Sequence, residues 1–230
     1  MKNRMINKYK IHAFDNKQDL INTIKDKHKI LVAMNAEKIL KDDERLRQLV
    51  NTNIGYPDGI GAVLALRQKG LYAVKIPGAE FWIDIIKRYK DEKSFYLIGS
   101  SQEVIEETVA KLRREFPSLN IAGYQNGYID QVGKKELKQT LAQIKPNVVF
   151  VAQGSPRQEF LMEELMTVHP ALYMGLGGSF DVYCGLKKRA PKLFINLGLE
   201  WLYRLLKEPT RIGRQIVLMK FLLLFLFNRL

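Results

Sequence analysis

The 230-residue chain is poor in the residues that cross-link a protein or hold a metal. Cys184 is its only cysteine, which excludes an intramolecular disulfide and fits a reducing compartment. The three histidines, His12, His28 and His169, lie far apart, and no Asp-x-Asp triplet occurs. We therefore expect no metal and no cofactor. Cys184 is expected to be a buried structural thiol and His169 a loop residue.

Long apolar runs are also missing. The first nineteen residues lack the apolar core of a secretory signal. Near the other end, Ile216–Phe227 forms a twelve-residue apolar run that only Lys220 interrupts. A membrane-spanning helix needs roughly 20 such residues, so this run is too short to cross a bilayer alone.

Acidic residues are fewer than basic ones, and most of the excess positive charge lies in one part of the chain. Lys and Arg number 37 against 24 Asp and Glu, a net charge of +13. Residues 187–230 hold ten basic and two acidic side chains, hence +8, which leaves +5 for the other 186 residues. Such a tail predicts an anionic partner: nucleic acid, phosphate groups or an anionic membrane. The apolar run beside it does not suit a solvated nucleic-acid face, so we expect no nucleic acid.

Buried strands and helices alternate along the chain, which is long enough and apolar enough (47%) for a substantial core. Four apolar runs predict strands: Ile30–Met34, Phe95–Ile98, Val148–Ala152 and Ala171–Leu176. Helical patterns cover Phe81–Tyr89, about Ser101 to Phe116, where Ser100 and Glu103 have capping-box spacing, and Gln158–Val168. The alternation predicts a Rossmann-like α/β fold, a mainly parallel sheet flanked by helices. We divide the chain into an α/β body, 1–190, and a helical, membrane-associating C-terminal appendage, 191–230.

Polar residues follow all four predicted strands where each strand ends. They are Asn35, Gly99-Ser100-Ser101, Gln153-Gly154-Ser155-Pro156 and Gly177-Gly178-Ser179. In parallel sheets, ligands bind at the carboxyl ends of the strands. The sequence therefore predicts a site along one edge of the sheet.

The first candidate motif is YPDGIG at residues 56–61. Pro57 restricts the backbone before Asp58, and Gly59 allows close approach of another chain segment. A carboxylate on such a turn could act as a general base. The alternative is a turn aspartate that caps a helix beginning near Ile60.

The second motif, GSPRQE at residues 154–159, joins a strand to a helix. Backbone amides at a helix N-terminus attract phosphate, and Arg157 adds positive charge. The alternative is ordinary turn chemistry, with Ser155 as the N-cap and Pro156 as the first helical residue.

The third motif, GLGGSFD at residues 175–181, is glycine-rich. It differs from the dinucleotide fingerprint because Phe180 occupies the sixth place of G-x-G-x-x-G. Asp181 could accept a hydrogen bond from a ribose or a base. The alternative is a tight turn in which Asp181 caps a helix.

Three arginines mark the basic tail. Arg204, Arg211 and Arg214 are spaced by seven and three and would share one helix face, although Pro209 interrupts it. They could grip a pyrophosphate or support a membrane-interface segment. The alternative is a terminal core helix or a dimer helix.

Several ordered stretches together resemble the WecG/TagA/CpsF family of bacterial glycosyltransferases, from about Lys29 to Gln215. The stretches are NAEK (35–38), PDGIG (57–61), PGA (77–79), GSPRQE (154–159), MGLGGSFD (174–181), KRAPK (188–192), NLGLEWLYR (196–204) and EPTR (208–211). Each stretch is weak alone, whereas the ordered set is specific.

The resemblance implies an inverting hexosyltransferase with a UDP-sugar donor and undecaprenyl-diphosphate-GlcNAc as acceptor. It implies a cytoplasmic enzyme, peripheral on the inner face of the cytoplasmic membrane, without an established metal requirement. NAEK and Val168-His169-Pro170 are most similar to the enterobacterial common antigen branch, which transfers N-acetyl-D-mannosaminuronic acid (ManNAcA) in the lipid I to lipid II step. The teichoic-acid branch, which transfers N-acetylmannosamine (ManNAc) to the same acceptor, is the alternative.

The resemblance also assigns roles to residues. Asp58 matches the proposed catalytic base, and Asn35 and Gln158 match active-site polar residues. The appendage arginines, expected to close over the lipid diphosphate, are matched by Arg204, Arg211 and Arg214. The remaining predicted substrate-binding residues are Lys75, Gly99, Gly154, Ser155, Arg157, Gly177, Gly178 and Asp181.

Two positions depart from the family pattern. Ala33 stands where the teichoic-acid branch has a threonine, so no hydroxyl role carries over. Lys75 stands where arginine is expected; it keeps the charge and loses the bidentate geometry. Two other classes of function stay open: a nucleotide-sugar-binding regulatory module without catalysis, and a nucleic-acid-binding protein. Whether the chain forms a homo-oligomer is also open.

Overall fold

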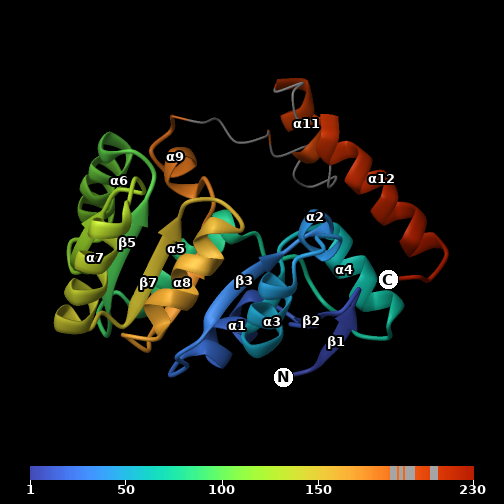
Figure 1. Cartoon of the computed structure of the whole chain (residues 1–230), viewed down its shortest axis with the longest axis horizontal. Helices are drawn as coiled ribbons and strands as arrows, with labels where there is room; N and C mark the ends of the chain where they lie inside the picture. Colours follow the sequence, from blue (N-terminus) through green and yellow to red (C-terminus); the bar gives the residue numbers. More distant parts are fainter. Residues whose placement is uncertain (187–190, 192–193, 195–199, 208–211) are drawn as a thin grey trace.

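The chain folds around one eight-stranded sheet, seen in a computed structural model of the protein (Figure 1). The structure describes residues 1–186, 191, 194, 200–207 and 212–230. The strands are β1 (Asn3–Ile6), β2 (Tyr9–His12), β3 (Ile30–Met34), β4 (Ile54–Pro57), β5 (Ser94–Gly99), β6 (Asn120–Gln125), β7 (Val148–Ala152) and β8 (Leu172–Gly175). Their order is β1-β2-β4-β3-β8-β7-β5-β6, and every neighbouring pair is parallel except β1 with β2. The predicted mainly parallel α/β fold is confirmed.

Four strands were not anticipated from the apolar runs, namely β1, β2, β4 and β6. β4 carries Gly55 and Pro57, which normally punctuate turns. Gly55 is needed because a Cβ there would lie 2.9 Å from the Lys10 carbonyl oxygen on β2. Pro57 sits at the last position of the strand, where its missing N–H costs little. Tertiary packing therefore makes a strand where local pattern indicates a turn.

Helices cover both faces of the sheet, each over its own apolar cluster. On one face lie α1 (Lys17–Ile24), α5 (Gly78–Tyr89), α6 (Gln102–Glu115) and α9 (Ser179–Tyr183). On the other lie α2 (Ala36–Ile39), α3 (Glu44–Thr52), α4 (Ile60–Gln68), α7 (Gln131–Ile144) and α8 (Arg157–Met166). Side chains of β3 alternate between the clusters, with Val32 in one and Leu31 in the other, as the two-residue period of a strand requires.

Two predicted helix caps are displaced by one residue. Ser101, not Ser100, caps α6, because its side chain accepts a hydrogen bond from the Val104 N–H, while Ser100 adopts a left-handed φ of 56°. For α8 the N-cap is Pro156 rather than Ser155, and it makes no side-chain cap bond. The chain enters this helix through Gly154 at a φ of 76°, which carries Ser155 out to the surface.

The C-terminal segment contains α11 (Glu200–Lys207) and α12 (Ile212–Leu226), and α12 lies beside α2 and α4 (Figure 1). Phe221 is 6% exposed, and a Cβ at Gly61 of α4 would approach its ring to 3.1 Å. The Gln68 amide also donates a hydrogen bond to the Phe225 carbonyl. The predicted boundary at residue 190 lies outside the described residues. None of the helices in the described ranges is long and apolar enough to cross a membrane.

Candidate active site

Five neighbouring strands, β4, β3, β8, β7 and β5, end at one edge of the sheet. Because they are parallel, the loops that follow them lie along that edge. The predicted polar residues lie at these strand ends or in the loops after them, so the structure brings them together: Asp58, Asn35, Gly177, Gly154 and Gly99, in strand order. Their individual roles stay predictions.

Asp58 directly follows β4 in the chain, and its side chain contacts the first residue of α5. Its carboxylate Oδ1 accepts a hydrogen bond from the Gly78 N–H at 2.7 Å, and its own N–H donates to the Met34 carbonyl at 3.0 Å. The alternative that Asp58 caps the helix beginning near Ile60 is wrong, because Gly59 is that N-cap and makes no side-chain bond. An amide at a helix N-terminus stabilises negative charge, so this carboxylate is both oriented and electrostatically supported.

Asn35 lies directly beside the Asp58 turn. Its Oδ1 accepts a hydrogen bond from the Lys38 N–H at 2.9 Å and caps α2. A Cβ at Gly59 would lie 3.2 Å from the Asn35 Cβ, so glycine permits the two loops to touch. The half-buried Asn35 therefore presents a polar group next to the carboxylate.

Tyr56 is a buried polar residue at this site that sequence reasoning did not select. Its side chain is fully buried, and its hydroxyl has no hydrogen-bond partner among the residues that the structure describes. A Cβ at Gly78 would lie 2.7 Å from the Tyr56 Oη and 3.5 Å from the Asp58 Oδ1, so the hydroxyl lies under the start of α5. Burial, and then the charges of Asp58 and Glu159, raise the pKa of Tyr56 well above its ordinary value, and the phenol stays protonated.

The Gln158 side chain is buried and makes hydrogen bonds to other residues of the protein. The side chain is 4% exposed; its Oε1 accepts a hydrogen bond from the Gly177 N–H at 2.8 Å, and its Nε2 donates to Glu159 at 3.3 Å. Gln158 thereby fastens the loop after β8 to the first turn of α8. This arrangement favours positioning of the loop over direct contact with a reacting atom.

Lys38 and Glu159 form a buried ion pair that the sequence pattern did not suggest. Lys38 Nζ lies 2.7 Å from Glu159 Oε1, and the side chains are 8% and 1% exposed. Burial raises the pKa of the Glu159 carboxyl, but the charge and hydrogen bond of Lys38, with smaller contributions from Ser155 and Gln158, bring the pKa below its ordinary value. The only available signal was that each residue is the last of a selected motif, NAEK or GSPRQE.

A second polar contact joins the loop after β5 to α9. The Ser100 hydroxyl donates a hydrogen bond to Asp181 Oδ2 at 3.2 Å. Gly99 is required there, because its φ is 137° and a Cβ would lie 2.3 Å from the Ala152 carbonyl oxygen. Asp181 lies in the first turn of α9, whose N-cap is Gly178, so the alternative that Asp181 itself is the cap is wrong.

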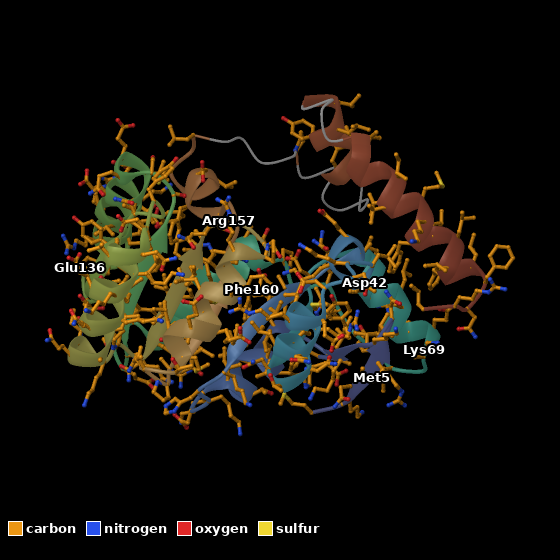
Figure 2. All side chains as sticks on the ribbon, viewed as in Figure 1. Met5, Asp42, Lys69, Glu136, Arg157 and Phe160 are labelled. Atoms are coloured by element: carbon orange, nitrogen blue, oxygen red, sulfur yellow. The ribbon has the colours of Figure 1, made fainter. Side chains whose placement is uncertain are left out.

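The structure describes the side chains of some of the predicted charged residues but not of others. Arg157 is exposed at the start of α8, and Figure 2 shows it at the end of that helix nearer α9, with Phe160 farther along. Lys75 is half-buried; the next residue, Ile76, pairs with Pro57 through the backbone and places this segment beside the Asp58 turn. Arg211 lies outside the described residues. Arg204 and Arg214 lie on α11 and α12, but their side chains are outside the described part.

The side chains of Cys184 and His169 both make contacts within the protein. The half-buried Cys184 thiol lies 3.0 Å from the Thr108 hydroxyl, and burial raises its pKa. His169, in the loop after α8, has its ring Nε2 2.7 Å from the Pro146 carbonyl oxygen. Across the described ranges, no three His, Cys, Asp or Glu side chains are grouped so as to hold a metal ion.

The fold is that of a Rossmann-like α/β protein, in which ligands generally bind at the carboxyl ends of the parallel strands, where the predicted polar residues lie. The family model described as "Glycosyl transferase WecG/TagA/CpsF family" matches residues 5–230, and the chain belongs to this family. It is therefore a glycosyltransferase of polysaccharide biosynthesis, an enzyme that uses a sugar donor. The resemblance inferred from the ordered motifs is confirmed.

Proposed function

We propose that this glycosyltransferase moves ManNAcA from UDP-ManNAcA to the GlcNAc of undecaprenyl-diphosphate-GlcNAc, with inversion at the anomeric carbon. The observation that carries the site assignment is the Asp58 carboxylate, held by the Gly78 N–H beside Asn35 at the edge shared by β3 and β4. The choice of donor sugar and acceptor rests on the resemblance of NAEK and Val168-His169-Pro170 to the enterobacterial common antigen branch.

Asp58 is the proposed general base. The acceptor hydroxyl attacks the anomeric carbon from the face opposite UDP, and Asp58 takes the hydroxyl proton as the new C–O bond forms. The bond from the anomeric carbon to the UDP phosphate oxygen breaks at the same time, and its electron pair leaves with UDP. The bond from Gly78 holds one carboxylate oxygen in place through this step.

Charge develops on the departing UDP and needs stabilisation. The N-terminus of α8 supplies backbone amides and the exposed Arg157, next to the glycine-rich loop that carries Gly177 and Gly178. Lys75 adds a second cation beside the Asp58 turn. These groups support the assignment of the diphosphate to this part of the edge.

The C-terminal helices are proposed to hold the lipid acceptor and the membrane surface. One face of α12 packs on the body through Phe221, and the opposite face is exposed. The exposed apolar residues recur at helical spacing: Ile216, Met219, Leu223, Leu226 and, just beyond the helix end, Phe227. With the basic residues of the tail, this face suits an interfacial helix on an anionic membrane. We therefore propose peripheral attachment at the inner face of the cytoplasmic membrane.

The test offers UDP-ManNAcA and UDP-ManNAc side by side to the full chain, with a GlcNAc-diphosphate-lipid acceptor, and identifies products by mass. We expect kcat/KM for UDP-ManNAcA to exceed that for UDP-ManNAc by at least about tenfold. Preference for UDP-ManNAc would assign the teichoic-acid activity instead. UDP-sugar binding without transfer to the lipid would indicate a regulatory module and contradict the proposal.

A further inference from the structure

The sheet opens at its centre on the side where the site lies. Between β3 and β8 only two residue pairs are in register, Ile30 with Tyr173 and Leu31 with Met174. The junctions β3–β4, β5–β7 and β7–β8 have four or five registered pairs, whereas β2–β4, toward the edge of the sheet, has one. The ladder between β3 and β8 therefore ends at Leu31 and Met174, and the last three residues of β3 extend beyond it. Backbone pairing between these two strands does not fix the spacing of the loops that follow them.

The Lys38–Glu159 ion pair bridges this opening. Lys38 belongs to α2, which follows β3, and Glu159 belongs to α8, which packs on β8 and β3. The two residues are 121 positions apart in sequence, yet their charged atoms lie 2.7 Å apart in an almost fully buried contact. The pair therefore links, through side chains, two segments that the ladder does not join.

The ends of this link reach two predicted active-site residues. On one side, the Lys38 N–H donates to Asn35 Oδ1. On the other, Glu159 Oε1 accepts from Gln158 Nε2, and Gln158 Oε1 accepts from the Gly177 N–H. A continuous polar chain thus connects the loop after β3, the start of α8 and the glycine-rich loop after β8.

Stability does not account for such a pair. Moving two charges out of water carries a desolvation cost that their attraction offsets only in part, and apolar replacements of both partners are often neutral or stabilising. The same two helices contribute apolar residues to one buried cluster, namely Ile39 from α2 and Leu161 and Met162 from α8. What an apolar pair lacks is the direction and fixed distance of an ion pair with further hydrogen bonds.

We propose that Lys38 and Glu159 are positioning residues that set the distance between the loops after β3 and β8, and thereby align Asn35 and Gln158 for sugar transfer. The inference rests on the proposed function for its kinetic consequence. Neither residue touches the reacting atoms; both act through their neighbours.

The double variant Lys38→Met/Glu159→Leu separates positioning from folding. We expect the thermal stability of the double variant to be close to that of wild type. Either single substitution leaves one buried charge without its partner and therefore lowers stability. In the double variant kcat should fall by at least about tenfold, with the donor KM changed by less than about threefold. A double variant with wild-type stability and wild-type kcat would overturn the proposal. If the double variant does not fold, Glu159→Gln, which keeps the side-chain volume, replaces it; its stability should be lower because the Lys38 charge loses its partner, and the kinetic criteria apply at a temperature at which it stays folded.

A matched control is available on the same helix. Arg45 and Glu163 form an exposed ion pair between α3 and α8 at 2.8 Å. The variant Arg45→Gln/Glu163→Gln removes this pair, and kcat should stay within about twofold of wild type. An equal fall in kcat for both double variants would show a general disturbance of α8 and would also overturn the proposal.

Amide hydrogen exchange tests the inference independently of the donor sugar. Backbone amides of residues 175–179 should exchange at least about tenfold faster in the Lys38→Met/Glu159→Leu variant, while those of α5 keep their rates. Unchanged exchange at 175–179 would overturn the positioning role whatever the enzyme transfers. If the wild type transfers neither ManNAcA nor ManNAc but the exchange result holds, the proposed function fails and the positioning link stands.

Discussion

The carboxylate of Asp58 and the backbone N–H of Gly78 meet in a hydrogen bond of 2.7 Å, across 20 residues of chain. The contact connects the end of a central strand to the first turn of a twelve-residue helix. It gives the candidate base a fixed direction and places it where a helix N-terminus stabilises negative charge.

Replacing Asp58 with Asn should abolish most of the transfer. The asparagine oxygen can still accept the bond from Gly78, so the fold should persist, but the amide cannot take a proton from the acceptor. We expect kcat to fall by about 100-fold or more, measured with the lipid acceptor, at an unchanged melting temperature. Asp26→Asn, at an exposed position, is the matched control. Turnover close to wild type in the Asp58 variant would remove it as the base.

Adding one methyl group at Gly78 should disturb the same contact. The new Cβ would lie 2.7 Å from the Tyr56 hydroxyl, and that fully buried side chain cannot easily move. We expect Gly78→Ala to lower both the melting temperature and kcat, and Tyr56→Phe to restore part of the stability in that background by deleting the clashing atom.

The control for the added methyl group is Gly213→Ala on α12, where nothing lies within 4 Å of the new Cβ. Its stability should be unchanged or higher by up to about 1 kcal/mol, since alanine favours helix. Chemical denaturation measures the free energy of unfolding of wild type, Gly78→Ala, Gly78→Ala/Tyr56→Phe and Gly213→Ala. A Gly78→Ala protein as stable as wild type would show that the Tyr56 hydroxyl does not constrain this position.

His12 should make the fold sensitive to mild acid. Burial, together with the charge of Lys10, lowers the pKa of the His12 ring below its ordinary value of 6.5, although a bond to the Gly55 carbonyl opposes the shift. The unfolded chain therefore takes up the proton first, and stability present above pH 6.5 is lost as the pH falls below it.

The measurement is the denaturant midpoint of wild type and His12→Gln at a series of pH values from about 7.5 to 5. The slope below pH 6.5 should be smaller in the His12 variant, whereas His28→Gln, at an exposed position, should keep the wild-type slope. Equal slopes in all three proteins would contradict the assignment.

The two faces of α12 should behave differently when mutated. Replacing Leu223, Leu226 and Phe227, which are 51%, 66% and 71% exposed, with Gln should weaken binding to anionic lipid vesicles by at least about tenfold and leave stability unchanged. Phe221→Ala on the buried face should instead cost roughly 3–5 kcal/mol of stability. Vesicle sedimentation and denaturation measure the two effects. Undiminished vesicle binding by the triple variant would contradict a membrane role for this face.

The sequence predicts the sheet best where its strands are buried on both faces. β3 and β7 match their predicted bounds, because a run of five apolar residues is typical of a strand that is buried on both faces of a parallel sheet. β6 lies at an edge and has no buried residue, and β4 contains glycine and proline, so neither shows a local strand pattern. Their strand conformation depends on neighbours that are distant in the chain.

The same distinction between local and long-range information applies to the residues of the candidate site. Position in sequence was enough to select Asn35, Asp58 and Gln158, because each follows a strand or opens a helix and belongs to an ordered family motif. Their partners were not selectable: Gly78 for Asp58, Gly177 for Gln158 and the Lys38–Glu159 pair between two motifs. Partner choice is a long-range property, since it depends on which strands become neighbours.

By itself, then, the sequence determines that this chain forms a mainly parallel α/β sheet with polar loops at one edge, and its ordered motifs determine the glycosyltransferase family. Those properties follow from local apolar periodicity and from residue order. Only the tertiary structure decides that β8 enters the sheet beside β3, that the ladder stops short there, and that one buried ion pair bridges the opening. The physical reason is that close packing and desolvation act between residues more than a hundred positions apart, which no local pattern encodes.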